Sequence, residues 1–118
     1  MSAMPQLLEE AFEAFNAHDT PRLRPLFHDK STWPNTLDDG ADPVGKEAVM
    51  AYFARIFATI IPNIQLIQIL DETADALTTE VQYSVESLDG HIWTDTRSRL
   101  IYHFRDGLLC GQTILDGY

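Results

Sequence analysis

Cysteine is nearly absent from this chain: Cys110 is the single one among 118 residues. No disulfide can therefore form within the chain, which fits a reducing compartment. We interpret Cys110 as a small apolar residue of the core.

Basic residues are also scarce, since eight lysines and arginines stand against 18 aspartates and glutamates, for a formal net charge of −10. A phosphate backbone or an anionic membrane would be repelled by this charge. We therefore expect neither nucleic acid nor a membrane surface as a partner.

Long hydrophobic runs are missing too. The longest uncharged stretch, residues 56–70, is interrupted by Pro62 and is too short to span a bilayer. The first residues include Glu9, Glu10 and Glu13, whereas a signal peptide carries a basic and then an apolar region. We expect a cytoplasmic protein.

Three helices are predicted in the first half of the chain. An apolar stripe at helical spacing predicts one that ends near His18. Asp19 or Thr20 caps a second, shorter helix. The longest helix begins near Gly45 and stops before Pro62.

Strands follow the helices, and we predict four of them, at residues 63–70, 76–87, 92–104 and 108–115. The last three form a meander through the Asp89-Gly90 and Asp106-Gly107 turns. Helices followed by antiparallel strands have to gather on one face of the sheet. The prediction is an α+β fold, in which a cone-shaped, curved antiparallel sheet wraps around three N-terminal helices as a single domain of residues 1–118.

The pleat of the strand at 92–104 predicts which side chains face the interior. Its even positions are uncharged, whereas the odd ones include Asp95, Arg97 and Arg99. Charges cannot face a closed core unpaired, so we place the even positions inside. In the last strand, hydropathy does not choose between the two faces, because Leu109, Thr113 and Leu115 compete with Cys110, Gln112 and Ile114.

Residues 35–44 form a polar loop without periodicity. The segment 40–47 is close to a phosphate-binding loop, but Glu47 stands where that loop needs a hydroxyl. Asp38, Asp39 and Asp42 indicate a solvated acidic loop rather than a cation site. The four histidines lack metal-binding spacing, so we predict no metal and no cofactor.

Several segments of the chain resemble the nuclear transport factor 2-like superfamily, in particular its SnoaL-like polyketide cyclase and ketosteroid isomerase branch. They are residues 14–19 (AFNAHD), 26–29 (LFHD), 45–53 (GKEAVMAYF) and 102–109 (YHFRDGLL). The resemblance covers nearly the whole chain and implies the cone-shaped fold and a homodimer. It specifies the activity poorly, because the same cone hosts isomerases, cyclases, hydrolases, dehydratases and binding modules.

The catalytic residues implied by the resemblance are missing. The ketosteroid isomerase base falls on Pro34 or Asn35, and its two oxyanion donors fall near Ala11 and Leu100. The His and Asp of SnoaL-like cyclases fall on Gln112 and Ile114. Asp95, Arg97 and Arg99 are only superficially similar to the Asp-Arg-Asp arrangement of limonene epoxide hydrolase-like members, because they occupy the odd, outward positions of the strand at 92–104.

The side chains on the inward faces of the helices and strands predict an apolar pocket with a few directional hydrogen bonds. Its predicted ligand-binding residues are Phe15, Trp33, Asn35, Phe53, Phe57, Tyr83, Leu100, Tyr102 and Gln112. His28, which precedes Asp29 near the expected pocket mouth, is a weak candidate for acid-base work.

Three functions stay open at this point. The first is binding of a small apolar molecule, with isomerisation, cyclisation or hydration through a carbonyl polarised by Tyr83, Tyr102, Asn35 or Gln112. The second is ligand binding without turnover. The third is a dimerisation module whose contact patch is Trp93 and Ile101 on the outer sheet face.

Overall fold

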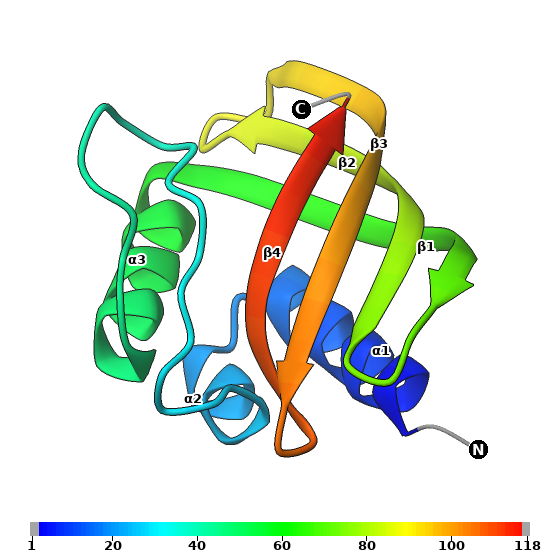
Figure 1. The fold of residues 1–118 in the computed structure, drawn as a ribbon. Helices are drawn as coiled ribbons and strands as arrows, with labels where there is room; N and C mark the ends of the chain where they lie inside the picture. Colours follow the sequence, from blue (N-terminus) through cyan, green and yellow to red (C-terminus); the bar gives the residue numbers. More distant parts are fainter. Residues whose placement is uncertain (1–2, 117–118) are drawn as a thin grey trace.

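The structure is a computed structural model that describes residues 3–116 (Figure 1). Its helices are α1 (Met4–Asn16), α2 (Thr20–Leu23), the 3₁₀ helix η1 (Arg24–Leu26) and α3 (Lys46–Thr59). Its strands are β1 (Ile60–Glu72), β2 (Ala76–Ser87), β3 (Ile92–Arg105) and β4 (Leu108–Asp116). In this part of the chain, no helix combines the length and the apolar character needed to cross a bilayer.

The strands form one antiparallel sheet in the order β1-β2-β3-β4. The sheet curves, and α1 and α3 lie on its concave side (Figure 1). The predicted fold class is therefore confirmed. The predicted meander is present as well: at the β3–β4 turn Asp106 and Gly107 have φ angles of 53° and 77°. Such left-handed pairs match the twist of the strands that they connect.

The predicted helix starts agree with the structure. A carboxylate oxygen of Asp19 accepts the backbone N–H of Arg22 at 3.2 Å, which caps α2. Gly45 precedes α3 with a φ of 93°, a conformation that favours glycine. Helix α1 ends at Asn16, slightly before the predicted end near His18.

Strand β1 differs from its prediction, since it begins at Ile60 rather than at residue 63 and contains Pro62. We expected Pro62 to separate the helix from the strand. Strand β1 is an edge strand, paired with β2 alone. An edge strand tolerates a proline whose nitrogen faces away from its neighbour, because no hydrogen bond is lost there.

The inner face of the sheet is the one predicted from the pleat. In β3 the side chains at even positions from 98 to 104 are buried, while Arg97 and Arg99 are exposed. In β2 the side chains of Val81, Tyr83 and Val85 are buried as well. These residues form one core with the buried apolar stripes of α1 and α3.

A β-bulge in β3 breaks the alternation near its start. Val85 pairs with Thr94, and the next residue of β2, Glu86, pairs with Ile92. Trp93 is therefore the additional residue between these two pairs. Trp93 and Thr94 consequently both border a groove on the inner side of the sheet. The prediction that Trp93 faces outward is wrong, so Trp93 does not form one patch with Ile101. Homodimerisation through the outer face stays a prediction.

A second bulge explains why hydropathy could not orient the last strand. Cys110 is the additional residue of β4 opposite His103 and Phe104. Leu109 is buried before the bulge, and Gln112 borders the interior after it. The inward side chains of β4 therefore come from odd positions before Cys110, such as Leu109, and from even positions after it, such as Gln112. Each of the two faces that hydropathy could not distinguish thus contributes to the interior.

The segment that follows η1 covers the edge of β4 at Leu109 and Cys110. The N–H of His28 donates to the carbonyl of Leu109 at 2.8 Å, and the N–H of Thr32 donates to that of Cys110 at 2.9 Å. A covered edge does not offer free backbone groups to another strand.

Asn16 joins the end of α1 to the edge strand β1. Its side-chain amide donates to the carbonyl of Ile64 at 2.8 Å, and its side-chain oxygen accepts the N–H of Ile64 at 2.8 Å. The amide thus replaces a strand neighbour at this one residue and positions α1 under the sheet.

Replacing Asn16 by alanine should lower the free energy of unfolding by about 1–3 kcal/mol, because two partly buried backbone groups of Ile64 lose their partner. Urea denaturation followed by circular dichroism measures this change. Asn63→Ala is the matched control, since the side chain of Asn63 is exposed on the same strand. A loss as small for Asn16→Ala as for Asn63→Ala would contradict the role of this amide.

Candidate ligand-binding cavity

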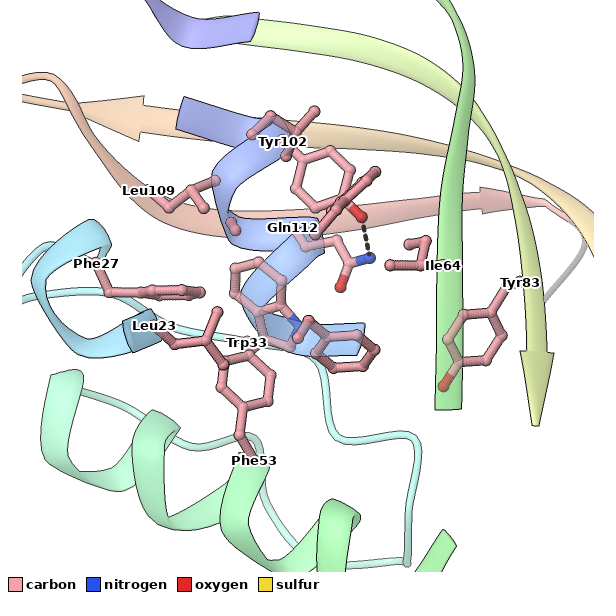
Figure 2. A pocket seen from close by; sticks show the side chains of 13 residues that line it. Leu23, Phe27, Trp33, Phe53, Ile64, Tyr83, Tyr102, Leu109 and Gln112 are labelled. Carbon is pink, nitrogen blue, oxygen red and sulfur yellow. Dashed lines mark hydrogen bonds between the residues drawn. The ribbon is translucent and has the colours of Figure 1, made fainter. Parts of the chain in front are cut away.

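A small cavity lies between α1, the segment around Trp33, α3 and the inner face of the sheet. Its volume is about 40 Å³, and it has more apolar than polar wall. Figure 2 shows that Phe27 and Leu109 lie on one side of the cavity and Tyr83 on the other.

Trp33 connects the aromatic residues of the cavity. Its ring centre lies 5.3 Å from that of Phe27, 5.5 Å from that of Phe53 and 6.1 Å from that of Tyr102. The tilted and edge-to-face geometries of these pairs are the favourable ones for aromatic rings. The cavity wall is thus a packed ring cluster that joins the loop, α3 and β3.

Tyr102 and Gln112 supply a hydrogen-bonded pair of polar side chains on this wall (Figure 2). The side-chain amide of Gln112 donates to the hydroxyl oxygen of Tyr102 at 3.4 Å. Because that oxygen accepts from Gln112, the hydroxyl hydrogen of Tyr102 can be donated to a molecule in the cavity.

Burial raises the pKa of the Tyr102 hydroxyl far above its ordinary value of 10.0. The neighbouring Tyr83 raises this pKa further, and the hydrogen bond from Gln112 opposes the shift. Near neutral pH, Tyr102 is consequently a hydrogen-bond donor and not a base.

The cavity offers little for proton transfer. Tyrosines are the only titratable residues on its wall among residues 3–116, so neither a carboxylate nor an imidazole faces it. The same described residues contain no group of three or more His, Cys, Asp or Glu side chains that could hold a metal ion. The arrangement can bind a molecule and polarise an oxygen of it, but it lacks a group that takes a proton from carbon.

Six of the nine predicted ligand-binding residues line the cavity. They are Phe15, Trp33, Phe53, Tyr83, Tyr102 and Gln112. They come from α1, the loop, α3, β2, β3 and β4, so the fold brings together side chains that are far apart in the sequence.

Asn35, in contrast, organises its own loop and does not line the cavity. Its amide nitrogen donates to Asp38 at 2.7 Å, and its side-chain oxygen accepts the backbone N–H of Leu37 at 3.0 Å. Asparagine often holds a loop in this way. Asn35 therefore lies outside this cavity, and its role in polarising a ligand carbonyl stays a prediction.

Phe57 and Leu100 also lie away from the cavity wall. The ring of Phe57 stacks on that of His18, with 4.7 Å between the ring centres, and its centre lies 5.3 Å from that of the Phe15 ring. Leu100 is completely buried in the core. The apolar stripe of the longest helix predicted an inward position for Phe57, and the pleat of β3 predicted one for Leu100, but the apolar interior extends beyond the cavity.

His28 is outside the cavity as well. Its Nε2 atom lies 3.1 Å from a carboxylate oxygen of Asp106 in the β3–β4 turn, and its Nδ1 atom accepts the N–H of Lys30 at 3.0 Å. This ring therefore connects the segment after η1 to a turn. The proposal of His28 as the proton carrier of the pocket does not agree with this position.

The charges of β3 lie on the outer face, as predicted. The side-chain amide of Gln82 donates to Asp95 at 2.7 Å, and Arg99 forms an ion pair with Asp116. None of these charges reaches the cavity, so the epoxide hydrolase-like arrangement is not built there.

Seven further residues line the cavity and were absent from the predicted site. They are Leu8, Ala11, Phe12, Leu23, Phe27, Ile64 and Leu109. The apolar stripes of the helices signalled most of them as core residues, without distinguishing core from cavity wall. Leu109 had no such signal, because the bulge at Cys110 changes which positions of β4 face inward.

Comparisons with known proteins agree with this fold. Residues 8–111 match the family model described as a SnoaL-like domain. No curated protein matches the chain significantly.

Three solved structures represent the structural matches. A Mycobacterium tuberculosis protein in complex with estradiol-17beta-hemisuccinate has a TM-score of 0.81 at 20% identity, covering 100% of this chain and 94% of that one. The Δ5-3-ketosteroid isomerase of Mycobacterium sp. has a TM-score of 0.80 at 14% identity, covering 100% and 93%. A computationally designed 17-OHP binder has a TM-score of 0.81 at 20% identity, covering 100% and 93%. At these identities the likeness shows the fold alone.

The raised pKa of Tyr102 predicts how stability depends on alkaline pH. Above pH 10.0 the unfolded chain loses the proton of this tyrosine while the folded chain keeps it. The free energy of unfolding should therefore fall as the pH rises above this value, by about 1.4 kcal/mol per pH unit from this one group. Urea titrations across this range, on the wild type and on Tyr102→Phe, should show a shallower fall in the variant. Equal slopes would contradict the burial of this hydroxyl.

Proposed function

Because the chain belongs to the SnoaL-like domain family, we propose that it binds a small, mainly apolar molecule through an oxygen of that molecule. The observation that carries this proposal is the hydroxyl of Tyr102, which Gln112 orients within a mainly apolar cavity. The hydroxyl donates its hydrogen to a carbonyl or hydroxyl oxygen of the ligand.

The charge of the protein supports a neutral ligand. No basic side chain lines the cavity within residues 3–116, and the chain carries a formal net charge of −10. An anionic ligand would leave water without gaining an opposite charge, which is unfavourable. A ketone or an alcohol on a ring system needs no such partner.

The solved relatives support a ligand of the steroid type. One of them was crystallised with an estradiol ester, and a designed protein of the same fold binds 17-OHP. We extend this chemistry to the present chain as a fused-ring ketone whose oxygen meets Tyr102. The aromatic wall around Trp33 offers flat, apolar surfaces for such rings.

We favour binding without turnover over isomerisation, cyclisation or hydration. Each of these reactions needs a group that takes or gives a proton, and the described cavity wall carries only tyrosines for this purpose. Tyr102 can polarise a carbonyl, but it stays protonated near neutral pH. Polarising the carbonyl is not sufficient for these reactions, because they also need a group that transfers a proton.

Binding of progesterone, a neutral fused-ring ketone, tests the proposal. Wild-type protein should bind it, and Tyr102→Phe should weaken the affinity about three- to tenfold, because one hydrogen bond is lost. The combined fluorescence of Trp33 and Trp93 reports the binding without a further substitution, since the chain has only these two tryptophans.

His28→Ala is the control for this experiment, because His28 lies outside the cavity. Its affinity should equal that of the wild type. An absence of binding, or an equal loss in both variants, would contradict the assignment of the cavity.

A second measurement separates binding from catalysis. A 3-keto-Δ5-steroid incubated with the protein should isomerise no faster than in buffer, because the cavity lacks a base. The ultraviolet absorbance of the conjugated product measures the rate, and the mycobacterial isomerase serves as the positive control. Turnover that disappears in Tyr102→Phe would instead establish an enzyme.

A further inference from the structure

A groove on the inner side of the sheet lies next to the cavity, towards the ends of β2 and α3. Its volume is about 270 Å³. Leu37, Ile56 and Ile60 form its apolar wall, and Trp93 and Thr94 border it from β3. No charged side chain lines the groove within residues 3–116.

The groove and the cavity share walls through a narrow hollow between them, with a volume of about 20 Å³. Trp33, Phe53 and Gln112 line both this hollow and the cavity. Tyr83 lines all three spaces, so its ring separates the inner space from the outer one. A molecule that passes Tyr83 therefore touches the cavity and the groove at once.

The volumes decide where the bulk of a ligand can lie. The cavity of about 40 Å³ has room for roughly three water molecules. Sites for molecules of drug size have about 300–1,000 Å³. The groove approaches that range, whereas the cavity can hold only one end of such a molecule.

We propose that this groove is an outer subsite, which holds the apolar body of an elongated, neutral, fused-ring ligand whose oxygen end reaches Tyr102 past Tyr83. The proposal rests on the proposed function and adds to it the shape of the ligand and its second contact surface.

Trp93 supplies the main surface of this subsite. Its side chain is 65% exposed, although it faces the concave side of the sheet. The bulge opposite Val85 places it there beside Thr94, whose hydroxyl offers a neutral hydrogen bond. A flat apolar ring that covers Trp93 removes both surfaces from water, which favours binding.

Three ketones of increasing length test the subsite, because they carry the same unsaturated ring at one end. They are 2-cyclohexenone, its bicyclic octalone analogue and progesterone. Amide NMR titrations of the whole chain give the affinity of each. We expect the affinity to rise with length, and only the longer two should shift the resonances of the groove.

Trp93→Ala should weaken the binding of progesterone about three- to tenfold and leave that of 2-cyclohexenone unchanged. Thr94→Phe, which narrows the groove, should also weaken progesterone. Ile92→Ala is the matched control, because Ile92 is 68% exposed on the same strand and does not line the groove. Tyr102→Phe should weaken all three ketones.

The outcomes distinguish the two proposals. If Trp93→Ala and Thr94→Phe both keep the affinity for progesterone within twofold while Tyr102→Phe lowers it, the outer subsite is wrong and the proposed function stands. If the wild type binds none of the ketones, both proposals are wrong. A loss confined to the longer ketones supports the outer subsite.

Discussion

Within residues 3–116, no charged side chain lines the cavity or the groove on the inner side of the sheet, and this is the constraint on which the remaining structure depends. A charge enclosed between the sheet and the helices would lose its water without gaining a partner. The charged residues of β3 consequently face outward, where Arg99 pairs with Asp116 and Asp95 accepts from Gln82. Hydroxyl, phenol and apolar side chains remain for the interior, and they determine what the interior can bind.

The same constraint limits the chemistry of the site. In the part of the chain that the structure describes, the cavity wall has no carboxylate and no imidazole, so it suits neutral, apolar molecules but offers no base. Tyr102 illustrates both aspects, because the burial that raises its pKa keeps it a donor. Relatives with the same fold include an isomerase, and so the shared fold does not decide between binding and turnover. The side chains on the wall decide it.

Two bulges determine which residues of the sheet meet the interior. The first brings Trp93 to the concave side, and the second, at Cys110, lets β4 contribute Leu109 and Gln112 although their numbers differ in parity. Without the second bulge, Gln112 would face away from Tyr102. The hydrogen bond between Gln112 and Tyr102 in the cavity therefore depends on the additional residue Cys110 of β4.

The sequence alone determined the order of the elements, the α+β class, the caps and turns, and the inner face of β2 and of the second half of β3, because helical spacing, strand alternation and the conformational preferences of Asp and Gly act locally. Only the tertiary structure decided the positions of Trp93, Cys110 and Gln112, because a bulge arises from the pairing between strands. It also placed Asn35 in its loop and His28 beside Asp106, since these hydrogen bonds join residues whose proximity no local pattern encodes.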